Sequence, residues 1–367
     1  MSYSSTQFSG VSALFKIDFK LFILVIMIVI IGLATLFSVS GGDSNLIIKQ
    51  LIRVVIGLTA MILLAQIHPD NLRLFAPFLY IFGIILLVLT IFFGVGKSAD
   101  RWLDFYILRF QPSELMKLFV PLMIASFYSD KALPPKLKNL SIAVIIIVIP
   151  ALLIAKQPDL GTALLITSSG VIAIFLSGIK LSHIFLGTGL VIGAIPLLWS
   201  FMYEYQKSRI LSFFSPNTDA LGSGYHLAQS KISLGSGGLF GKGYMNGTQS
   251  QLDFLPENHT DFIFSAFGEE FGFIGVLILI TLYVLVALRG MSISIKATDN
   301  FSRILSATLI LTIFLYVLVN VGMVVGILPI VGAPLPFMSY GGTSMLTVFA
   351  ALGIIMSIKS HQRLLRK

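Results

Sequence analysis

Apolar residues in this chain occur in blocks of about 20, the length at which a helix spans a bilayer, and short polar segments separate the blocks. Inside lipid, every backbone hydrogen bond has to be made within the protein, which only helices and closed barrels achieve. Barrel strands would show short runs of alternating apolar and polar residues, and these blocks do not. The pattern therefore predicts an all-α, polytopic membrane protein.

Ten blocks are predicted to span the membrane. They cover residues 21–40, 46–66, 74–94, 112–129, 139–155, 160–178, 182–201, 262–288, 304–326 and 343–359. The first block is longer than the core of a signal peptide and is not followed by a small-residue cleavage site, so we expect it to remain as a span. No soluble domain or low-complexity tract interrupts the series, and residues 1–367 are predicted to form one integral membrane domain.

Lysine and arginine residues are distributed unevenly between the predicted loops. If the N-terminus is cytoplasmic, the loops on that side hold more than half of the 25 Lys and Arg residues and a quarter of the 16 acids. The positive-inside rule then places both termini in the cytoplasm. The longest loop, residues 202–261 between spans seven and eight, faces the periplasm or cell exterior of a bacterial-type cell.

Charge and cysteine content narrow the classes of partner and cofactor. The formal net charge is +9, but the basic residues are spread through short loops, so we predict no nucleic-acid partner. The chain has no cysteine, which excludes disulfides and Cys-based metal or redox sites.

Polar residues gather where the even-numbered spans begin. In the predicted orientation these spans start outside, so their unpaired N–H groups and positive dipole ends face the outer leaflet. We expect the five starts to meet in one outward-facing cavity suited to a phosphate or pyrophosphate. The residues concerned are Lys49, Gln50 and Arg53; Gln111, Pro112, Ser113, Glu114 and Lys117; Asp159; Thr260 and Asp261; and Gly341, Gly342, Thr343 and Ser344.

Asp261 is the first candidate for function, because a carboxylate at a lipid interface costs free energy unless solvent, a cation or a substrate meets it. The alternative is a helix N-cap, a role that the neighbouring Thr260 could itself fill. Asp159 has the same alternative, and there the cap is favoured. His259 either orients Asp261, contacts substrate or is a solvated loop residue.

Other acids allow a structural as well as a functional interpretation. Glu114 and Lys117 lie three residues apart on one helix face, where an ion pair would relieve both charges. Such a pair is as typical of a brace as of a functional pathway. Glu257, Glu269 and Glu270 are interpreted as loop or helix-surface acids, although the last two lie within an apolar helix, which suggests a polar partner.

Two further segments carry candidate binding residues. Arg101 and Trp102 precede a segment of alternating character that could lie along the membrane interface, with Trp102 as an anchor. The long loop combines Lys231 and Lys242 with eight glycines, at positions 222, 224, 235, 237, 238, 241, 243 and 247. The loop is either flexible or brings its backbone close to a glycan or phosphate.

Five motifs occur in order along the chain: RWLDFYILRFQPSELMKL, QPDLGTAL, GYHLAQSKISLGSGGLFGKG, GTQSQLDFLPENHTDFIFSAFGEEFG and PLPFMSYGGTSML. Together they resemble the SEDS family of shape, elongation, division and sporulation proteins, most closely its rod-shape member, over nearly the whole chain. The resemblance implies a ten-span glycosyltransferase that polymerises lipid II into peptidoglycan strands outside the cytoplasmic membrane. It also implies a class B penicillin-binding protein as transpeptidase partner.

The same resemblance implies roles for individual residues. It makes Asp261 the essential acid of the HTDFIF motif, and it maps family motif positions onto Glu114, Lys117, Arg101, Trp102 and Asp159. The approach to the Arg-Trp pair, GVGKSADRWLD, departs from the family pattern and leaves the roles of Lys97 and Asp100 open.

Glycosyl transfer from a diphosphate donor needs a base and a way to stabilise the leaving group. We expect Asp261 to act as general base toward the acceptor sugar's 4-hydroxyl, with inversion at the donor carbon. The expected cationic clamp consists of Lys117, Arg101, Lys231 and Lys242, and a divalent cation could assist. The alternatives are a lipid II flippase or transporter, which would carry ionisable groups near the bilayer midplane, and a structural scaffold.

Overall fold

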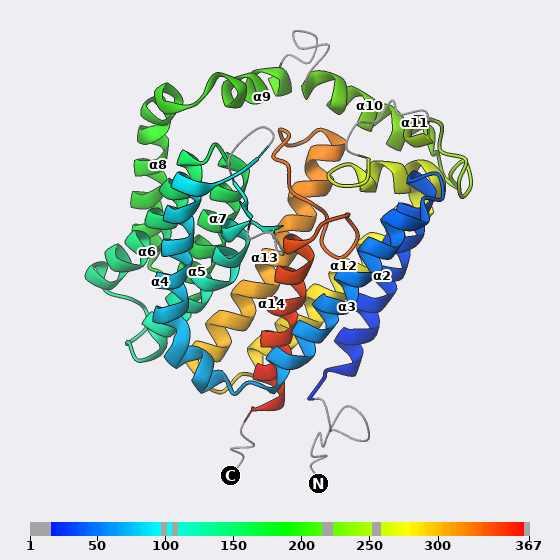
Figure 1. Cartoon of the computed structure of the whole chain (residues 1–367). Helices are drawn as coiled ribbons and strands as arrows, with labels where there is room; N and C mark the ends of the chain where they lie inside the picture. Colours follow the sequence, from blue (N-terminus) through cyan, green and yellow to red (C-terminus); the bar gives the residue numbers. More distant parts are fainter. Residues whose placement is uncertain (1–15, 97–100, 105–108, 215–222, 252–257, 363–367) are drawn as a thin grey trace.

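The structure, a computed structural model, describes residues 16–96, 101–104, 109–214, 223–251 and 258–362. Within these residues a long helix forms over each of the ten predicted spans, which confirms the all-α polytopic fold (Figure 1). The helices are α2 Phe19–Val39, α3 Ser44–Gln66, α4 Pro69–Phe93, α5 Pro112–Ser129, α6 Leu137–Lys156, α7 Leu160–Leu176, α8 Leu181–Phe201, α12 Ile263–Ile295, α13 Asn300–Val325 and α14 Thr343–Ser360. Seven of the described helices are long and apolar enough to cross a membrane, namely α2, α3, α4, α6, α12, α13 and α14.

Several helices begin outside the apolar blocks because polar residues cap them there. Helix α4 starts at Pro69, where the His68 ring accepts a hydrogen bond from Asp70 N at 3.2 Å. Helix α13 starts at Asn300, and the Asp299 carboxylate accepts one from Ser302 N at 2.8 Å. Such caps satisfy N–H groups that the helix itself leaves unpaired, so the helices extend into the polar interface.

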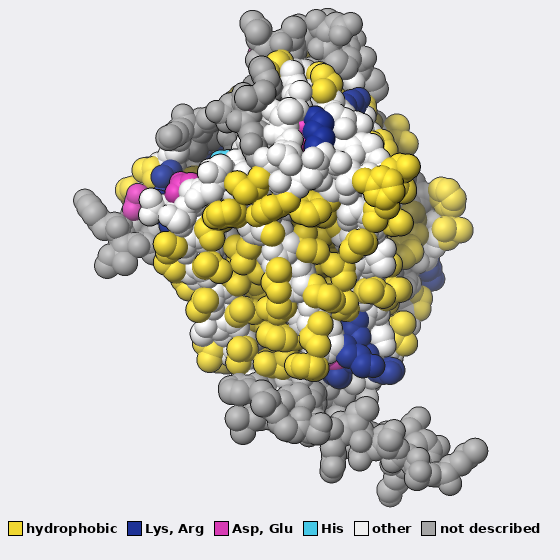
Figure 2. Space-filling view, turned by 90° about the vertical axis from the view of Figure 1, so that its right-hand side faces the viewer, with side chains coloured by type: hydrophobic (Ala, Val, Ile, Leu, Met, Phe, Trp, Pro, Cys, Tyr) yellow, Lys and Arg dark blue, Asp and Glu magenta, His cyan; other side chains and the backbone are white. Residues whose placement is uncertain are grey.

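Helices α13 and α14 lie in the interior of the bundle. Helix α14 packs along α3 and also contacts α5, α12 and α13, while α13 packs against α5, α7 and α12. Every side chain of α14 from Thr347 to Ile358 is buried. The helices around them expose large apolar side chains, such as Phe78 of α4 and Phe185 of α8. Figure 2 shows a broad apolar band on one face, with Lys and Arg gathered at its lower edge, as expected where a bundle meets lipid.

Two stretches outside the predicted spans form secondary structure. The segment after Trp102 pairs as an antiparallel two-stranded ladder, β1 Leu103–Asp104 with β2 Arg109–Phe110. The long segment over residues 202–261 contains α9 Glu204–Phe214, α10 Ser223–Ser236 and α11 Thr248–Gln251. These helices lie across one end of the bundle, and α10 packs against α12 and α13 (Figure 1). The interpretation of this segment as a flexible loop is therefore wrong for its described part.

The glycine-rich part of this segment closes a break in α12. Gly272 has non-helical dihedral angles inside α12, with φ +66° and ψ −166°. Four backbone hydrogen bonds cross the break: Lys242 N to Glu269 O (3.0 Å), Gly243 N to Glu270 O (3.0 Å), Phe273 N to Gly238 O (2.9 Å) and Ile274 N to Leu239 O (3.2 Å). A Cβ on Gly241 would lie 2.0 Å from Glu270 O, so only glycine fits there. The close approach is thus to the backbone of α12, which was not among the predicted partners.

The two ends of α14 mark opposite ends of the bundle. Beyond its C-terminus, His361 Nε2 lies 2.9 Å from Lys16 Nζ, so the two ends of the described chain meet here. Nearby, the buried Asp18 carboxylate accepts hydrogen bonds from Arg289, at 2.6 Å, and from Lys359. An 18-residue helix is about 27 Å long, so the N-terminus of α14 lies far from this cluster.

Candidate active site

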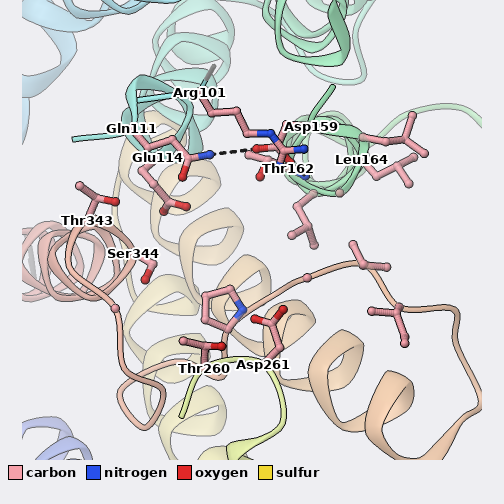
Figure 3. Close-up of a pocket in the computed structure, with 18 of the residues that line it drawn as sticks. Arg101, Gln111, Glu114, Asp159, Thr162, Leu164, Thr260, Asp261, Thr343 and Ser344 are labelled. Atoms are coloured by element: carbon pink, nitrogen blue, oxygen red, sulfur yellow. Dashed lines mark hydrogen bonds and ion pairs between the residues drawn. The ribbon is translucent and has the colours of Figure 1, made fainter. Parts of the chain in front are cut away.

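A cavity of about 440 Å³ lies at the N-terminal end of α14. Its walls come from the starts of α5, α7 and α14, the segment before α12, the Arg101–Trp102 pair and residues 329–334, with two side chains of α9 above. Figure 3 shows Asp261 on one side of the cavity and Arg101 with Asp159 on the other. The charged lining residues are Arg101, Glu114, Lys117, Asp159 and Asp261.

Helix N-termini make part of the wall polar without using charged side chains. Gln111 is the N-cap of α5 and Gly342 is the N-cap of α14, and neither makes a side-chain cap hydrogen bond. The first N–H groups of α14 are therefore left for solvent or a ligand. At α5, Pro112 has no N–H and Glu114 N donates to Gln111 O at 3.0 Å, so this helix contributes mainly its dipole. Both helix starts line the cavity.

The predicted meeting of five helix starts holds for four of them. The residues of α3 do not line the cavity. Arg53 stacks on the Tyr340 ring, 4.2 Å from its centroid, and Tyr340 itself forms the wall. Gln50 donates to Ser339 O at 3.1 Å. Helix α3 therefore supports the wall from behind, because α14 packs between it and the cavity.

Asp261 lies just before α12, and its backbone does not cap that helix. The N-cap is Phe262, so neither Thr260 nor Asp261 takes the predicted cap position. Gly332, at φ +75°, passes beside the Asp261 carboxylate, and a Cβ there would lie 3.5 Å from Asp261 Oδ2. Because Gly332 has no side chain, it adds nothing between itself and the Asp261 carboxylate. Both residues line the cavity.

Glu114 and Lys117 form the predicted ion pair, with Lys117 Nζ donating to Glu114 Oε1 at 2.6 Å. Both side chains are more than nine-tenths buried. The ammonium group also lies 4.8 Å from the centroid of the Tyr316 ring on α13. This pair joins α5 to α13 at the floor of the cavity.

Asp159 is the N-cap of α7, as favoured from the sequence, and it has two further partners. Its Oδ1 accepts from Thr162 N at 3.2 Å and lies 3.6 Å from an Arg101 nitrogen. Its Oδ2 accepts from Gln111 Nε2 at 2.9 Å. Arg101 also donates to the carbonyls of residues 157 and 158. Asp159 therefore ties the starts of α5 and α7 to the Arg101–Trp102 segment.

Among the described residues, the charges that line the cavity are three carboxylates and two cations. Lys117 already pairs with Glu114, and Arg101 already pairs with Asp159. The predicted cationic clamp is therefore not poised to bind an anion by charge alone. In this arrangement the uncapped starts of α5 and α14 are the groups that favour a phosphate.

Three predicted binding residues do not line the cavity. Lys242 donates to Glu269 Oε1 at 2.7 Å on α12. Lys231 is exposed on α10 and lies against Gly326 at the end of α13. His259 contributes its carbonyl, which accepts from Tyr340 N at 2.9 Å. The structure therefore does not bring Lys231 and Lys242 into the cavity, because the segment that carries them folds onto α12 and α13.

Glu269 and Glu270 are buried, so their interpretation as surface acids is wrong. Glu269 is fully buried and accepts hydrogen bonds from Lys242, Thr248 and Gln249. Glu270 accepts one from Ser38 of α2. The polar partner that the sequence suggested is thus the long segment folding back over the break in α12. Glu257, Lys97 and Asp100 lie outside the described residues.

Sequence reasoning missed the loop between α13 and α14. Pro329, Ile330 and Val331 line the cavity together with Gly332. Residues 329–333 precede the PLPF motif and include no ionisable side chain that would have drawn attention to them. The sequence signals that could have found this loop were its glycine and its prolines. In the structure that glycine, Gly332, is left-handed.

The model of the FtsW, RodA and SpoVE family of cell cycle proteins matches residues 13–364 of the chain. The chain belongs to this family. The peptidoglycan glycosyltransferase MrdB of Escherichia coli K12 is 46% identical over 353 residues, which cover 96% of this chain and 95% of MrdB. Stage V sporulation protein E of Bacillus subtilis is 33% identical over 365 residues, covering 94% of this chain and 98% of that protein.

Solved structures of this family have the same fold. The rod shape determining protein RodA of Thermus thermophilus superposes with a TM-score of 0.72 at 27% identity, covering 94% of this chain and 97% of RodA. A chain of a peptidoglycan synthase complex, described as coordinating polymerization and crosslinking, superposes with a TM-score of 0.83 at 27% identity. That alignment covers 95% of this chain and 98% of the other. The resemblance to SEDS proteins is confirmed.

Proposed function

We propose that this chain is a peptidoglycan glycosyltransferase that polymerises lipid II into glycan strands for cell elongation, with Asp261 as general base. The position of Asp261 carries the proposal: its carboxylate borders a cavity onto which the uncapped starts of α5 and α14 open. A base and an anion-binding wall in one cavity are what transfer from a diphosphate-linked sugar needs. The relative MrdB carries the name of this activity.

Strand extension joins the acceptor sugar's 4-hydroxyl oxygen to the anomeric carbon of the donor. Asp261 accepts the hydroxyl proton as the oxygen attacks. The bond between the anomeric carbon and the pyrophosphate oxygen breaks, and its electron pair leaves with undecaprenyl pyrophosphate. One displacement inverts an α-linked donor to a β-linked product. Because pyrophosphate leaves as a stabilised anion, no second carboxyl group is needed to protonate it, in contrast to most glycosidases.

Negative charge grows on the pyrophosphate as it leaves, and the free N–H groups at the start of α14, with the dipole of α5, would stabilise it. Lys117 and Arg101 would assist only by exchanging their carboxylate partners for the phosphate. No group of three His, Cys, Asp or Glu residues among the described residues is arranged to hold a metal ion. A divalent cation in this cavity would therefore need ligands from the pyrophosphate as well.

The chain is an integral protein of many spans, and we place it in the bacterial cytoplasmic membrane with the cavity facing outward. The distribution of Lys and Arg supports this orientation. The contact between Lys16 and His361 supports it further, because it sets the described ends of the chain opposite the cavity. Lipid II flipped to the outer leaflet could then reach Asp261.

We propose a class B penicillin-binding protein as partner, which would crosslink each new strand. The likeness to a chain of a synthase complex that coordinates polymerization and crosslinking supports this partner. The partner's membrane span would pack on an apolar face of the bundle, and the nascent strand would leave outward from the cavity.

The test is glycan synthesis from purified lipid II, with and without the partner. The Asp261→Asn variant should bind lipid II and fold normally, yet keep only a small residual polymerisation rate, because an amide cannot take the proton. The matched control is Asp43→Asn. Asp43 is exposed and caps α3 away from the cavity, and asparagine caps equally well, so full activity is expected.

Substantial polymer from Asp261→Asn would remove Asp261 as the base. The flippase alternative requires lipid II translocation in vesicles that survives this substitution. Transporters place coupling charges near the midplane, whereas the charges of this cavity lie at helix starts.

A further inference from the structure

The three backbone carbonyls just before α12 are each held by a different donor. His259 O accepts from Tyr340 N at 2.9 Å, and Thr260 O accepts from Ser339 Oγ at 2.6 Å. Asp261 O accepts from Asn320 Nδ2 at 2.9 Å. None of these bonds lies within a helix ladder, so together they dock one irregular segment onto the α13–α14 region.

Asn320 lies on α13, is fully buried and bridges two cavity segments. Its Nδ2 group donates to Asp261 O and also to Ala333 O, at 2.7 Å. Ala333 is fully buried beside Gly332, and Gly332 borders the Asp261 carboxylate. One amide group therefore sets the spacing between the Asp261 backbone and the loop segment around Ala333, which follows Gly332 in the cavity wall.

The amide of Asn320 is satisfied on one side only. Within the described residues its Oδ1 atom is buried and meets no donor, while both Nδ2 hydrogens are used. A buried amide oxygen without a donor costs free energy, and such exceptions call for an explanation in native structures. A side chain that served packing alone would not place an unpaired oxygen at this depth in a membrane bundle.

We propose that Asn320 is a positioning residue for glycosyl transfer, which fixes the Asp261 carboxylate relative to the cavity wall by donating to the Asp261 and Ala333 carbonyls. It contacts neither substrate nor the reacting atoms, since it does not line the cavity. The inference rests on the proposed function of Asp261. Misplacing a catalytic group by about 1 Å can cost about 100-fold in rate, so the loss of this bridge should act on turnover.

The experiment measures steady-state polymerisation of purified lipid II by the full-length chain with its partner. Asn320→Leu removes both donors and the unpaired oxygen and keeps the branched shape, with a somewhat larger side chain. We expect kcat to fall about 10- to 100-fold while the KM for lipid II stays within about threefold. Thermal unfolding is measured on the same samples, because the loss of the donor to the Asp261 and Ala333 carbonyls opposes the gain from removing the unpaired oxygen.

The matched control is Tyr283→Phe. The Tyr283 hydroxyl is buried and donates to Pro336 O at 2.6 Å, in the same loop, but has no bond to the segment before α12. If a bond into this loop mattered only for stability, both variants would alter kcat alike. We expect Tyr283→Phe to keep kcat within about twofold. Should Asn320→Leu not fold, Asn320→Ser, which keeps one donor, is measured by the same criteria.

A double substitution separates this inference from the proposed function. If Asn320 acts through Asp261, adding Asn320→Leu to Asp261→Asn should not lower the residual rate further. A wild-type kcat for Asn320→Leu, or a raised KM with unchanged kcat, overturns the positioning role while Asp261 remains the base. Full activity of Asp261→Asn instead overturns the proposed function itself.

Discussion

Carboxylates meet cations at both ends of α14, but the ratio of charges and the surrounding space differ. Near Ser360, the buried Asp18 faces two cations, Arg289 and Lys359, and caps α2 as well. Near Thr343, three carboxylates and two cations line a cavity of about 440 Å³. The first cluster satisfies its acid completely and joins α2, α12 and α14. The second borders a cavity with room for a ligand, and among the described residues its acids outnumber its cations.

The comparison teaches that residue type alone does not distinguish an ion-pair cluster that stabilises the bundle from a functional site. Both ends use aspartate, arginine and lysine at helix termini, and all carry a cost of desolvation. What differs is the space beside the charges, because only the second group lines a cavity of this size. Glu114 and Lys117 line the cavity, yet they pair with each other as the residues around Asp18 do. They therefore test the comparison most directly.

The largest effect on stability is expected for Glu114→Gln. This change leaves the Lys117 ammonium buried without its counter-charge, and breaking such a pair costs about 3–5 kcal/mol. Unfolding in detergent, followed by circular dichroism, measures the loss. The double variant Glu114→Gln with Lys117→Met should recover most of it, because no lone charge remains. A Glu114→Gln variant as stable as wild type would show that water or another group reaches Lys117.

The next effect is expected at the opposite end. Asp18→Asn leaves Arg289 and Lys359 without a carboxylate, but these side chains are 25% and 24% exposed, so water compensates in part. We expect a loss of about 2 kcal/mol in unfolding free energy. Polymerisation per folded molecule should be unchanged, the reverse of the pattern expected for Asp261→Asn. Lost activity with retained stability would break the distinction between the two ends.

Acid should reveal the same cluster without mutation. Burial raises the pKa of Asp18, but hydrogen bonds from Arg289, Lys359 and Leu21 N outweigh it, so its pKa falls from 3.8 to about 2. A depressed pKa means that the unfolded state binds the proton first. The stabilisation is therefore complete above about pH 4 and is lost as the pH falls toward 2, by about 2 kcal/mol. Unfolding at a series of pH values should show this slope in wild type and a weaker one in Asp18→Asn.

The smallest effect is expected for Asp159→Asn. Asparagine keeps the cap on Thr162 N and can still bond to Gln111 if that amide turns over, but the ion pair with Arg101 is lost. The Arg101 side chain is 31% exposed, so water compensates in part and stability should fall by about 1 kcal/mol. Asp159→Ala, which also removes the cap, should cost about 1 kcal/mol more. Equal losses for the two variants would show that the cap contributes nothing.

The positions of the long helices could be predicted because lipid imposes one length and one polarity on every span. Asp261, Glu114 and Asp159 were predictable as cavity residues because ionisable groups at helix starts in a membrane are costly and few. Their placement in one cavity is observed, whereas the catalytic role of Asp261 remains a prediction.

The partners of Lys242 and Glu269 could not be predicted, since they depend on how residues 237–251 fold back over α12. Sequence separation hides such contacts, and glycines indicate a close approach without naming what is approached. The contact between Asn320 and Asp261 could not be predicted either, because the two residues lie in different segments and no sequence pattern relates them. Tertiary hydrogen bonds to irregular backbone leave no periodic signal.

The break in α12 is bridged by backbone hydrogen bonds, and this determines which sequence changes the chain tolerates there. Four main-chain bonds pair residues 238–243 with residues 269–274, so the match depends on the number of residues between them and, at close approaches such as Gly241, on glycine. Phe240, 79% exposed at the tip, could be exchanged freely. Inserting or deleting a single residue there would shift every bond out of alignment, so variation in this stretch should be confined to substitutions.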